Sequence, residues 1–443
     1  MSKKYIEIYK KIKKFHKNIA VDGDKSISIR WALLASQSLG ISKAKNLLKS
    51  EDVVNTLKCL KQLGVNIVSK KNTCLISGLG INGFKYKSNI TLNAGNSGTL
   101  GRLILPLLIK SPYKIKIVGD KSLSKRDFSR VMTPLKEMGV NFYPKNKSTL
   151  PIYIKGSEYL RPITYMEKKG SAQCKSCVML SSLNVPGDTI IKAKKSRDHT
   201  ERMFKNLKLP IKLNKSKNFD YIKLSSPKRI NKLNMTIPGD ISSAAFFIVL
   251  TILSDNSKIL LKNININSSR IGIIKILKKM GAKIKLKNIK IQNGEKVSDI
   301  FVKSTKNLRG INCPTSLNSS AIDEFLIIFL VAAKAKGISY FKNLSELNQK
   351  ESPRLKIATR ILKLMNVKVK ANENSIIIFG NPKLNLKKKI IINNYLKDHR
   401  IMMMSVISAL SFGGVWKIYD PDSVKTSFPS FLGIIKKLGA NIK

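Results

Sequence analysis

The sequence predicts an α/β protein of two domains, each built from three copies of one helix-and-strand unit. Three observations support this prediction. An amphipathic helix followed by an alternating strand recurs six times, about every 70 to 85 residues. The tetrapeptide pattern Gly-Asp-x-Ser occurs three times, each time before an apolar stretch. The 443 residues are 43% hydrophobic, which is enough for large cores in two or three domains.

The six copies share a helix that is mostly closed by Gly or Asn and followed by a strand. Gly and Asn suit the left-handed conformation that follows a helix C-terminus. The long period indicates a supersecondary unit of two helices and several strands, not a solenoid repeat. The turns that end the helices lie near Gly64, Gly139, Leu209, Gly281, Asn366 and Gly439.

Six units divide into two domains of three, with the boundary in the stretch IPGD halfway along the chain. The first domain is expected over residues 22–239, and the second over residues 1–21 and 240–443. The stretch KYIEIYK has the pattern of a strand without a partner nearby, so it is expected to pair with the second half. The chain would then cross between the domains twice, and the cleft between them is the expected active site.

The Gly-Asp-x-Ser stretches GDKSISIR, GDKSLSKR and PGDISSAA are each expected at a helix start, where Asp and Ser act as N-caps. A helix N-terminus also attracts anions through its exposed N–H groups and its dipole. The third stretch lacks cations, so capping alone is the favoured interpretation there. For the first two, anion binding is favoured over capping alone, because they add the cations Lys25, Arg30, Lys121 and Arg126.

The formal net charge of +57 suggests at first a nucleic-acid-binding protein. The lysines, however, are spread along the whole chain and accompany abundant Asn and Ile. The sequence contains no RNA-binding aromatic motif, zinc finger or isolated basic tail. A solvated surface shaped by composition, which would also attract anionic substrates, is therefore favoured, and no nucleic-acid partner is expected.

The five cysteines do not suggest a disulfide framework, because their number is odd and no secretory signal precedes them. Cys174 and Cys177 form a C-x-x-C, but no second pair or nearby histidine completes a zinc site. Core thiols are favoured over a redox or metal role. The longest apolar runs fall short of the roughly 20 residues that span a bilayer, so a cytoplasmic protein without membrane contacts is expected.

Ten stretches in order resemble the EPSP synthase family, the 3-phosphoshikimate 1-carboxyvinyltransferases, over essentially the whole chain. The stretches are GDKSISIR, NAGNSGTLGRL, GDKSLSKR, SAQCKSCVMLSSL, KSRDHTERMF, PGDISSAAFF, AIDEF, KESPR, DHRIMM and TSFPSF. The resemblance implies two inside-out α/β domains, each of three βαβαββ repeats, that close over the substrates. The six helix turns predict three units per domain independently of this resemblance.

The resemblance also implies a transferase activity of the shikimate pathway to chorismate and the aromatic amino acids. Such an enzyme moves the enolpyruvyl group of phosphoenolpyruvate to the 5-hydroxyl of shikimate 3-phosphate and releases phosphate. The other product is 5-enolpyruvylshikimate 3-phosphate. The two substrates are then the only partners expected, with no cofactor, no metal ligand and a monomeric chain.

The site residues are carried over by their positions in the matching stretches. The resemblance places Lys25, Ser26 and Arg30 at the shikimate phosphate and the reacting centre, with Ser171, Ala172, Gln173, Ser196 and Lys350 around the phosphate. It places Gly98, Arg126, Arg354, Arg400 and Lys425 at phosphoenolpyruvate. The implied catalytic residues are Lys25, Asp323, which accepts a proton near the 5-hydroxyl, and Glu351, which acts at the methylene carbon.

The chemistry accounts for these residue types. Two polyanionic substrates repel each other, so several cations are needed, and arginine binds carboxylate and phosphate in bidentate fashion. Addition of the hydroxyl protonates the methylene carbon and the elimination of phosphate reverses that step, so one group must both give and take a proton. The sequence leaves open which carboxylate acts at which step.

Three positions depart from the family pattern, namely Ile29 in place of His, Pro353 in place of Asp and Met403 in place of a small residue. None of them removes a charged site residue. The rival enolpyruvyl transferase of peptidoglycan synthesis, which acts on UDP-N-acetylglucosamine, typically has a loop cysteine and a GAKN-like start, and this chain has neither. Two less favoured hypotheses are a basic nucleic-acid-binding protein, supported by net charge alone, and an inactive scaffold, which the intact set of charged residues argues against.

Overall fold

The computed structural model describes residues 4–443, which form two compact units. Unit 1 comprises the chain up to Asp22, Pro238–Ile291 and Lys296–Lys443. Unit 2 comprises Gly23–Ile237 and the short segment Gln292–Glu295. The chain therefore enters unit 2 twice, once for its main body and once for the tip of a hairpin in the second half of the sequence.

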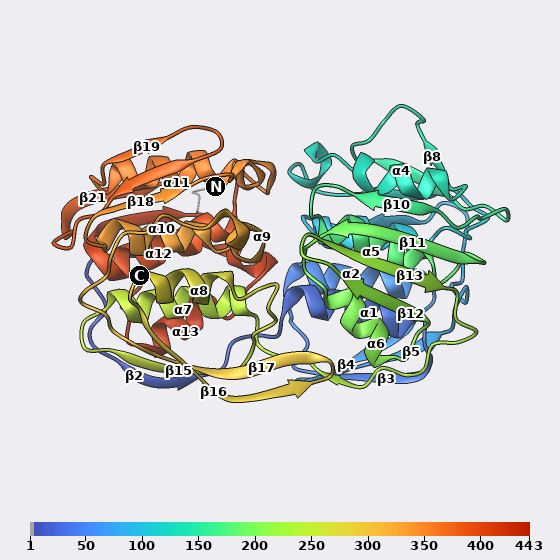
Figure 1. Cartoon of the computed structure of the whole chain (residues 1–443), viewed down its shortest axis with the longest axis horizontal. Coiled ribbons are helices and arrows are strands. Elements are labelled where there is room, and N and C mark those ends of the chain that lie inside the picture. The colour runs from blue at the N-terminus through green and yellow to red at the C-terminus, as the bar shows by residue number, and fades with distance from the viewer. Residues whose placement is uncertain (1–3) are drawn as a thin grey trace. The chain divides into compact units, whose positions relative to one another are not determined.

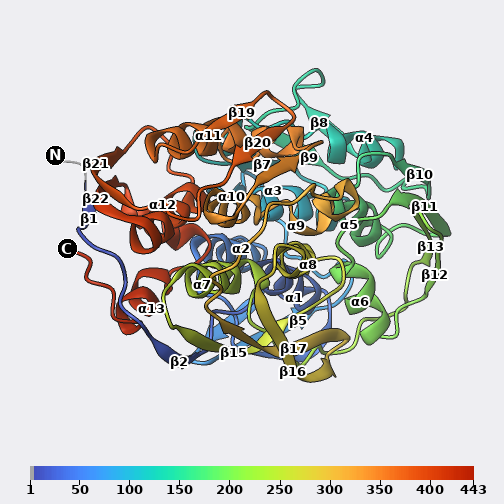
Figure 2. The same ribbon diagram turned by 60° about the vertical axis from the view of Figure 1, so that its left-hand side comes forward.

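Small mixed sheets surround the helices of each unit, and the three sheets of unit 2 share one topology. In each sheet the first two strands are parallel and the remaining pairs are antiparallel. Figure 2 shows β10, β11, β13 and β12 side by side in this order. The sheet orders are β14 (Met235–Thr236), β3 (Leu39–Lys45), β5 (Thr73–Leu79), β4 (Asn66–Ser69); β6 (Thr91–Asn93), β7 (Ile115–Val118), β9 (Ile152–Lys155), β8 (Asn141–Tyr143); and β10 (Thr164–Glu167), β11 (Asp188–Lys194), β13 (Phe219–Ser225), β12 (Ile211–Lys215).

Unit 1 also has three sheets among the described residues. The stretch KYIEIYK contributes β1, which pairs with β22 in antiparallel fashion and sets Tyr5 opposite Tyr419. This pairing agrees with the expectation that the first residues join the second half. The sheet orders are β16 (Lys283–Gln292), β17 (Glu295–Lys303), β15 (Lys258–Asn265), β2 (His16–Ile19); β18 (Ile338–Phe341), β20 (Ile376–Phe379), β19 (Val369–Ala371); and β1 (Tyr5–Ile8), β22 (Gly413–Tyr419), β21 (Leu386–Ile392).

Three buried helices form the centre of unit 2, and Figure 1 labels two of them, α1 and α5. They are α1 (Lys25–Ser36), α3 (Gly98–Leu103) and α5 (Ala172–Ser181). Each begins with a side-chain cap, because Asp24, Ser97 and Ser171 accept hydrogen bonds from backbone N–H groups of the first turn. The outer helices are α2 (Glu51–Gln62), α4 (Ser129–Glu137) and α6 (His199–Asn206), and the 3₁₀ turns are η1 (Leu105–Leu107) and η2 (Leu123–Lys125).

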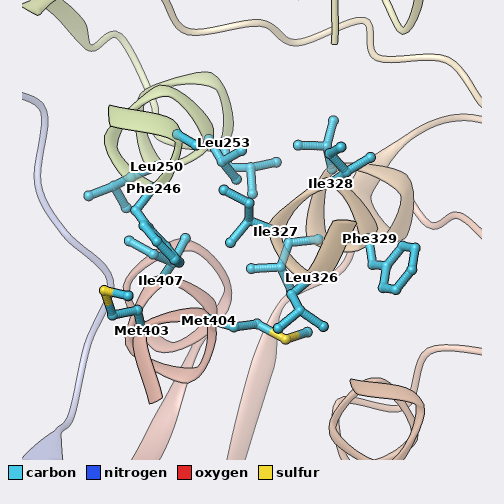
Figure 3. Packing of buried hydrophobic residues seen from close by; sticks show 14 of the residues in the cluster. Phe246, Leu250, Leu253, Leu326, Ile327, Ile328, Phe329, Met403, Met404 and Ile407 are labelled. Atoms are coloured by element: carbon cyan, nitrogen blue, oxygen red, sulfur yellow. The ribbon is translucent and has the colours of Figure 1, made fainter. Parts of the chain in front are cut away.

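Unit 1 has a matching central trio, α7 (Ile241–Leu253), α10 (Phe325–Lys334) and α12 (His399–Phe412). These helices are apolar on nearly every side, so they are buried all round. Figure 3 shows Phe246 and Leu250 of α7, Ile327 of α10 and Ile407 of α12 directed toward one another. The outer helices are α8 (Gly272–Lys279), α9 (Asn318–Ala321), α11 (Arg354–Leu364) and α13 (Phe431–Lys437), with 3₁₀ turns η3 (Thr315–Leu317), η4 (Ser345–Gln349) and η5 (Pro421–Thr426).

The predicted helix ends are confirmed, because a residue with positive φ lies at each of them. At five of the six ends it is the expected residue, namely Gly64, Gly139, Gly281, Asn366 or Gly439. At the third copy, the residue with positive φ is Lys208, one position before the expected Leu209. The six helices that end at these turns are α2, α4, α6, α8, α11 and α13. None of the helices within residues 4–443 has the length and apolarity needed to cross a membrane.

The Gly-Asp-x-Ser prediction holds for two of the three stretches. Asp24 and Asp240 cap α1 and α7. The second stretch was wrongly expected to start an α-helix. There Asp120 accepts a hydrogen bond from the backbone N–H of Leu123 at 2.7 Å and caps only the 3₁₀ turn η2. Arg126 follows the last residue of that turn and has an extended backbone conformation. Its cationic side chain therefore lies at the C-terminal end of the turn and not at a helix start.

Candidate active site

In unit 2, the start of α1 holds a lysine against a carboxylate. Lys25 is the first residue of the helix, and its ammonium lies 2.9 Å from the Asp52 carboxylate on α2. The Lys25 side chain is 21% exposed, so its charge remains accessible to a ligand. Ser26 follows it in the first turn. This helix start therefore offers a cation, a hydroxyl and backbone N–H groups together.

Arg30 lies deeper and joins three helices. Its Nε donates to the Thr200 hydroxyl at 2.8 Å, and Nη2 donates to the Ser176 hydroxyl at 3.0 Å. Its Nη1 donates to the backbone carbonyl of Ser26 at 3.2 Å. The residue is only 4% exposed. Arg30 thus positions the first turn of α1 against α5 and α6, in addition to any contact with a substrate.

The start of α3 lies beneath two guanidinium groups. A Cβ added at Gly98 would lie 3.0 Å from Nη1 of Arg126 and 3.1 Å from Nη1 of Arg102. Arg126 Nη2 donates to Asn96 Oδ1 at 3.2 Å. The absence of a side chain at Gly98 therefore lets the two arginines come close to the backbone of the helix start.

Arg102 lies among the candidate site residues, and the sequence reasoning missed it. Its Nη1 donates to Gln173 Oε1 at 2.7 Å, and the Gln173 amide donates to the Thr99 hydroxyl at 3.1 Å. Burial lowers the pKa of the Arg102 guanidinium, and the charge of Arg126 lowers it further. The available signal was a single cation within the apolar stretch GTLGRLILPLL. Gln173 is thereby held between α3 and α5.

The start of α5 and the loop before α6 complete this set. Ser171 caps α5 and Ala172 is its first residue. The Ser196 hydroxyl is buried and, within residues 4–443, has no hydrogen-bonding partner. A buried hydroxyl without a protein partner is free to bond to a ligand or to an ordered water.

In unit 1, Arg354 is buried among three carboxylates. Its Nε lies 2.8 Å from Asp398, its Nη2 lies 2.5 Å from Glu351, and its Nη1 lies 3.4 Å from Asp323. Burial alone would lower the pKa of Arg354, but Asp398, Glu351 and Asp323 raise it above its ordinary value. Asp398 is a second residue that the sequence reasoning missed, although it is the capping Asp of the stretch DHRIMM.

Asp323 lies at the centre of this group, within 4 Å of three cations. Its carboxylate lies 3.7 Å from Lys350 Nζ, 3.4 Å from Arg354 Nη1 and 3.9 Å from Arg400 Nη2. Arg400 also donates from Nη1 to the Asp323 backbone carbonyl at 2.8 Å. The fold therefore brings together four predicted residues from three stretches, AIDEF, KESPR and DHRIMM, and Glu351 of KESPR adjoins them through Arg354.

The remaining predicted residue of unit 1 is Lys425 on η5. Its ammonium pairs with Asp422 at 2.7 Å, and its side chain is 56% exposed.

The three departures from the family pattern lie in ordinary structural positions. Ile29 on α1 and Met403 on α12 are buried in the hydrophobic cores of their units, and Figure 3 shows Met403. Pro353 directly precedes α11. Within residues 4–443, His, Cys, Asp and Glu side chains form no group of three suited to a metal ion.

Comparisons with known proteins agree with one another. A model of the family EPSP synthase (3-phosphoshikimate 1-carboxyvinyltransferase) matches residues 9–435. The 3-phosphoshikimate 1-carboxyvinyltransferase of Vesicomyosocius okutanii subsp. Calyptogena okutanii is 40% identical over 430 residues, which is 96% of each chain. The solved EPSP synthase from Acinetobacter baumannii superposes with a TM-score of 0.87 at 33% identity, covering 99% of each chain.

The enolpyruvyl transferase NikO from Streptomyces tendae shares the fold at 13% identity, with a TM-score of 0.77 over 100% of this chain and 99% of that one. This likeness shows a common fold only. The relatives that match nearly the whole chain are EPSP synthases, so they favour this family over the enolpyruvyl transferase of peptidoglycan synthesis. The chain belongs to the EPSP synthase family, the 3-phosphoshikimate 1-carboxyvinyltransferases.

Proposed function

We propose that the residues of the two units described above carry out the enolpyruvyl transfer of this family. The observation that carries the assignment is the position of Asp323 among Lys350, Arg354 and Arg400. A carboxylate beside three cations combines a proton acceptor with binding groups for anions. A purely structural ion pair would need only one partner for each charge.

Shikimate 3-phosphate is proposed to bind through unit 2 at the starts of α1 and α5. Lys25 supplies a cation, and Ser26, Ser171, Ala172 and Gln173 supply side-chain and backbone donors at the two helix starts. Ser196 supports this assignment because its buried hydroxyl has no partner within the described residues. Arg30 orients the first turn of α1, and Lys350 of unit 1 also contacts the phosphate.

Phosphoenolpyruvate is proposed to bind through three arginines and a lysine. Arg126 holds its phosphate above Gly98, and Lys425 contacts that phosphate as well. Arg354 and Arg400 hold its carboxylate in bidentate geometry. Because Arg354 is already paired with Glu351 and Asp323, the incoming carboxylate competes with these side chains. Binding of phosphoenolpyruvate therefore frees the two groups that the reaction needs.

The proposed reaction proceeds by addition and elimination. Asp323 takes the proton of the 5-hydroxyl, whose oxygen forms a bond to the central carbon of phosphoenolpyruvate. Glu351 delivers a proton to the methylene carbon, and Lys25 stabilises the charge that develops at the reacting centre. Glu351 then takes a proton back from that carbon while the bond to the phosphate oxygen breaks. Phosphate leaves, and the proton held by Asp323 passes to it or to water.

The proposal extends to architecture and setting. Each unit is proposed to consist of three βαβαββ repeats, which the shared topology of the unit 2 sheets supports. The five buried, unbridged cysteines suit a reducing compartment such as the cytoplasm. A monomeric chain stays a prediction, and light scattering of the purified protein tests it.

A phosphate-release assay tests the proposed function. Release is expected only when phosphoenolpyruvate and shikimate 3-phosphate are both present, and it is expected to persist after treatment with a chelator. Asp323→Asn should abolish release while the protein stays folded. Release that depends on UDP-N-acetylglucosamine, or that Asp323→Asn leaves intact, would contradict the proposal.

A further inference from the structure

A buried glutamate lies directly behind Arg400. Glu324 precedes the first residue of α10, and its side chain is inaccessible to solvent. Its Oε1 lies 3.8 Å from Arg400 Nη1, and the same nitrogen donates to the neighbouring Asp323 carbonyl at 2.8 Å. The Arg400 guanidinium is thus in contact with two consecutive residues, through a backbone oxygen and a buried carboxylate.

Glu324 is itself held by a network that leads away from the proposed substrate residues. The Ser242 hydroxyl, on the first turn of α7, donates to Glu324 Oε1. The Arg270 guanidinium donates from Nη2 to the Ser242 hydroxyl at 2.8 Å and to Asp240 Oδ1 at 3.1 Å. Arg270 is 2% exposed, so these bonds are shielded from water. One oxygen of the Glu324 carboxylate is therefore held by the first turn of α7.

The fold does not depend on this charge to bring the helices together. The central trio α7, α10 and α12 already packs through apolar side chains along its length (Figure 3). Glu324 and Arg400 lie at the N-terminal ends of α10 and α12, beside Asp323. A buried carboxylate strongly favours a nearby cation, so Glu324 at 3.8 Å restricts where the Arg400 guanidinium can lie.

We propose that Glu324 is a positioning residue that orients Arg400 for the carboxylate of phosphoenolpyruvate, with Ser242 and Arg270 holding Glu324 in place. This inference rests on the proposed role of Arg400. Ser242 and Arg270 come from the stretches PGDISSAAFF and SSRIGI, which the proposed reaction does not otherwise use beyond helix capping. The network thus links a capping motif singled out in the sequence to substrate binding.

The test is Glu324→Gln in steady-state kinetics with each substrate varied in turn. Glutamine keeps the volume and an oxygen for the Ser242 hydroxyl, but it removes the charge that faces Arg400. The KM for phosphoenolpyruvate should rise about tenfold, by analogy with residues that orient the ligands of a metal ion. The KM for shikimate 3-phosphate should change by less than about twofold. Ser242→Ala keeps the glutamate charge but loosens its orientation, so it should raise the KM for phosphoenolpyruvate by a smaller factor.

Asp220→Asn is the matched control, because Asp220 is a buried carboxylate that faces Lys175 in unit 2. It should leave the ratio of the two KM values unchanged, even if the melting temperature falls. A purely structural role for Glu324 predicts the same behaviour for Glu324→Gln, and that result would overturn the inference.

Arg400→Ala separates this inference from the site assignment on which it rests. If Arg400→Ala raises the KM for phosphoenolpyruvate and Glu324→Gln does not, the positioning role alone is wrong. If Arg400→Ala leaves that KM unchanged, the assignment of Arg400 fails as well. In the double variant, Glu324→Gln should add no further increase, because its effect is exerted through Arg400.

Discussion

Arg354 donates from Nε to the Asp398 carboxylate at 2.8 Å, and the two side chains are 2% and 0% exposed. The arginine begins α11 and the aspartate caps α12, so this buried ion pair ties two helix starts together. Burial would raise the pKa of Asp398, but the charge of Arg354 holds it below its ordinary value. The pair therefore supports both the fold of unit 1 and the proposed binding of phosphoenolpyruvate.

Asp398→Asn should destabilise the protein in a pH-dependent way. A depressed carboxyl pKa stabilises the fold at pH values above the unfolded pKa of about 3.9, and this stabilisation is lost as the pH falls through the lower folded value. The cost near neutral pH should reach about 3 kcal/mol, because Arg354 loses its closest buried partner. Urea unfolding across the acid range should show the difference from the original protein shrinking below about pH 4.

Asp422→Asn provides the control for that experiment. Asp422 pairs with Lys425 at 2.7 Å, but both side chains are more than half exposed. Surface pairs contribute little, so the free energy of unfolding should change by less than about 1 kcal/mol. An equal loss for Asp398→Asn at every pH would show that the charge of the aspartate does not stabilise the fold.

Arg126→Ala and Arg400→Ala should both weaken phosphoenolpyruvate binding but differ in stability. Each removes a charge-assisted contact, so the KM for phosphoenolpyruvate should rise about tenfold or more. Arg126 lowers the pKa of neighbouring Arg102, which indicates repulsion, so its removal should keep or raise the melting temperature. Arg400→Ala removes the guanidinium group that faces the buried Glu324 carboxylate. The free energy of unfolding should therefore fall by about 3 kcal/mol. Thermal melts that show the same shift for both variants would contradict this contrast.

Gly98→Ala should raise the KM for phosphoenolpyruvate more than the KM for shikimate 3-phosphate. The new methyl group would lie 3.0 Å from Arg126 and 3.1 Å from Arg102, so both guanidinium groups must move by a few tenths of an ångström. Gly433→Ala is the matched control, because a Cβ there meets nothing within 4 Å. It should leave kinetics unchanged and stabilise α13 by up to about 1 kcal/mol, as expected for Gly→Ala inside a helix. Parallel changes of both KM values in Gly98→Ala would contradict a specific effect on the arginines.

The native protein should resist thiol reagents. Burial raises the pKa of Cys59 to about 12 and the pKa values of Cys74 and Cys313 to about 11. It also raises the pKa values of Cys174 and Cys177. Titration with a thiol-reactive dye at mildly alkaline pH should therefore detect almost no cysteine before unfolding and all five after it. One rapidly reacting thiol in the native protein would instead indicate a functional cysteine.

Much of the architecture could be predicted because it depends on local chemistry. The six helix ends require a residue that tolerates positive φ, and Gly64 or Asn366 meets this need wherever the chain goes next. The same holds for Asp24 and Asp240, whose side chains cap the helices that follow them. The second Gly-Asp-x-Ser stretch shows the limit, since its cap is followed by a 3₁₀ turn and not by an α-helix.

The order of residues is enough to establish how the elements alternate and, through the motifs, to which family the chain belongs. Which charges meet depends on the packing of the folded chain. Asp323, Lys350 and Arg400 come from different segments, and no periodicity relates them. The same is true of Arg102 beside Gln173 and of Glu324 behind Arg400. Side-chain charges interact through distance in space and through the loss of water around them, and both arise only when helices distant in sequence pack together.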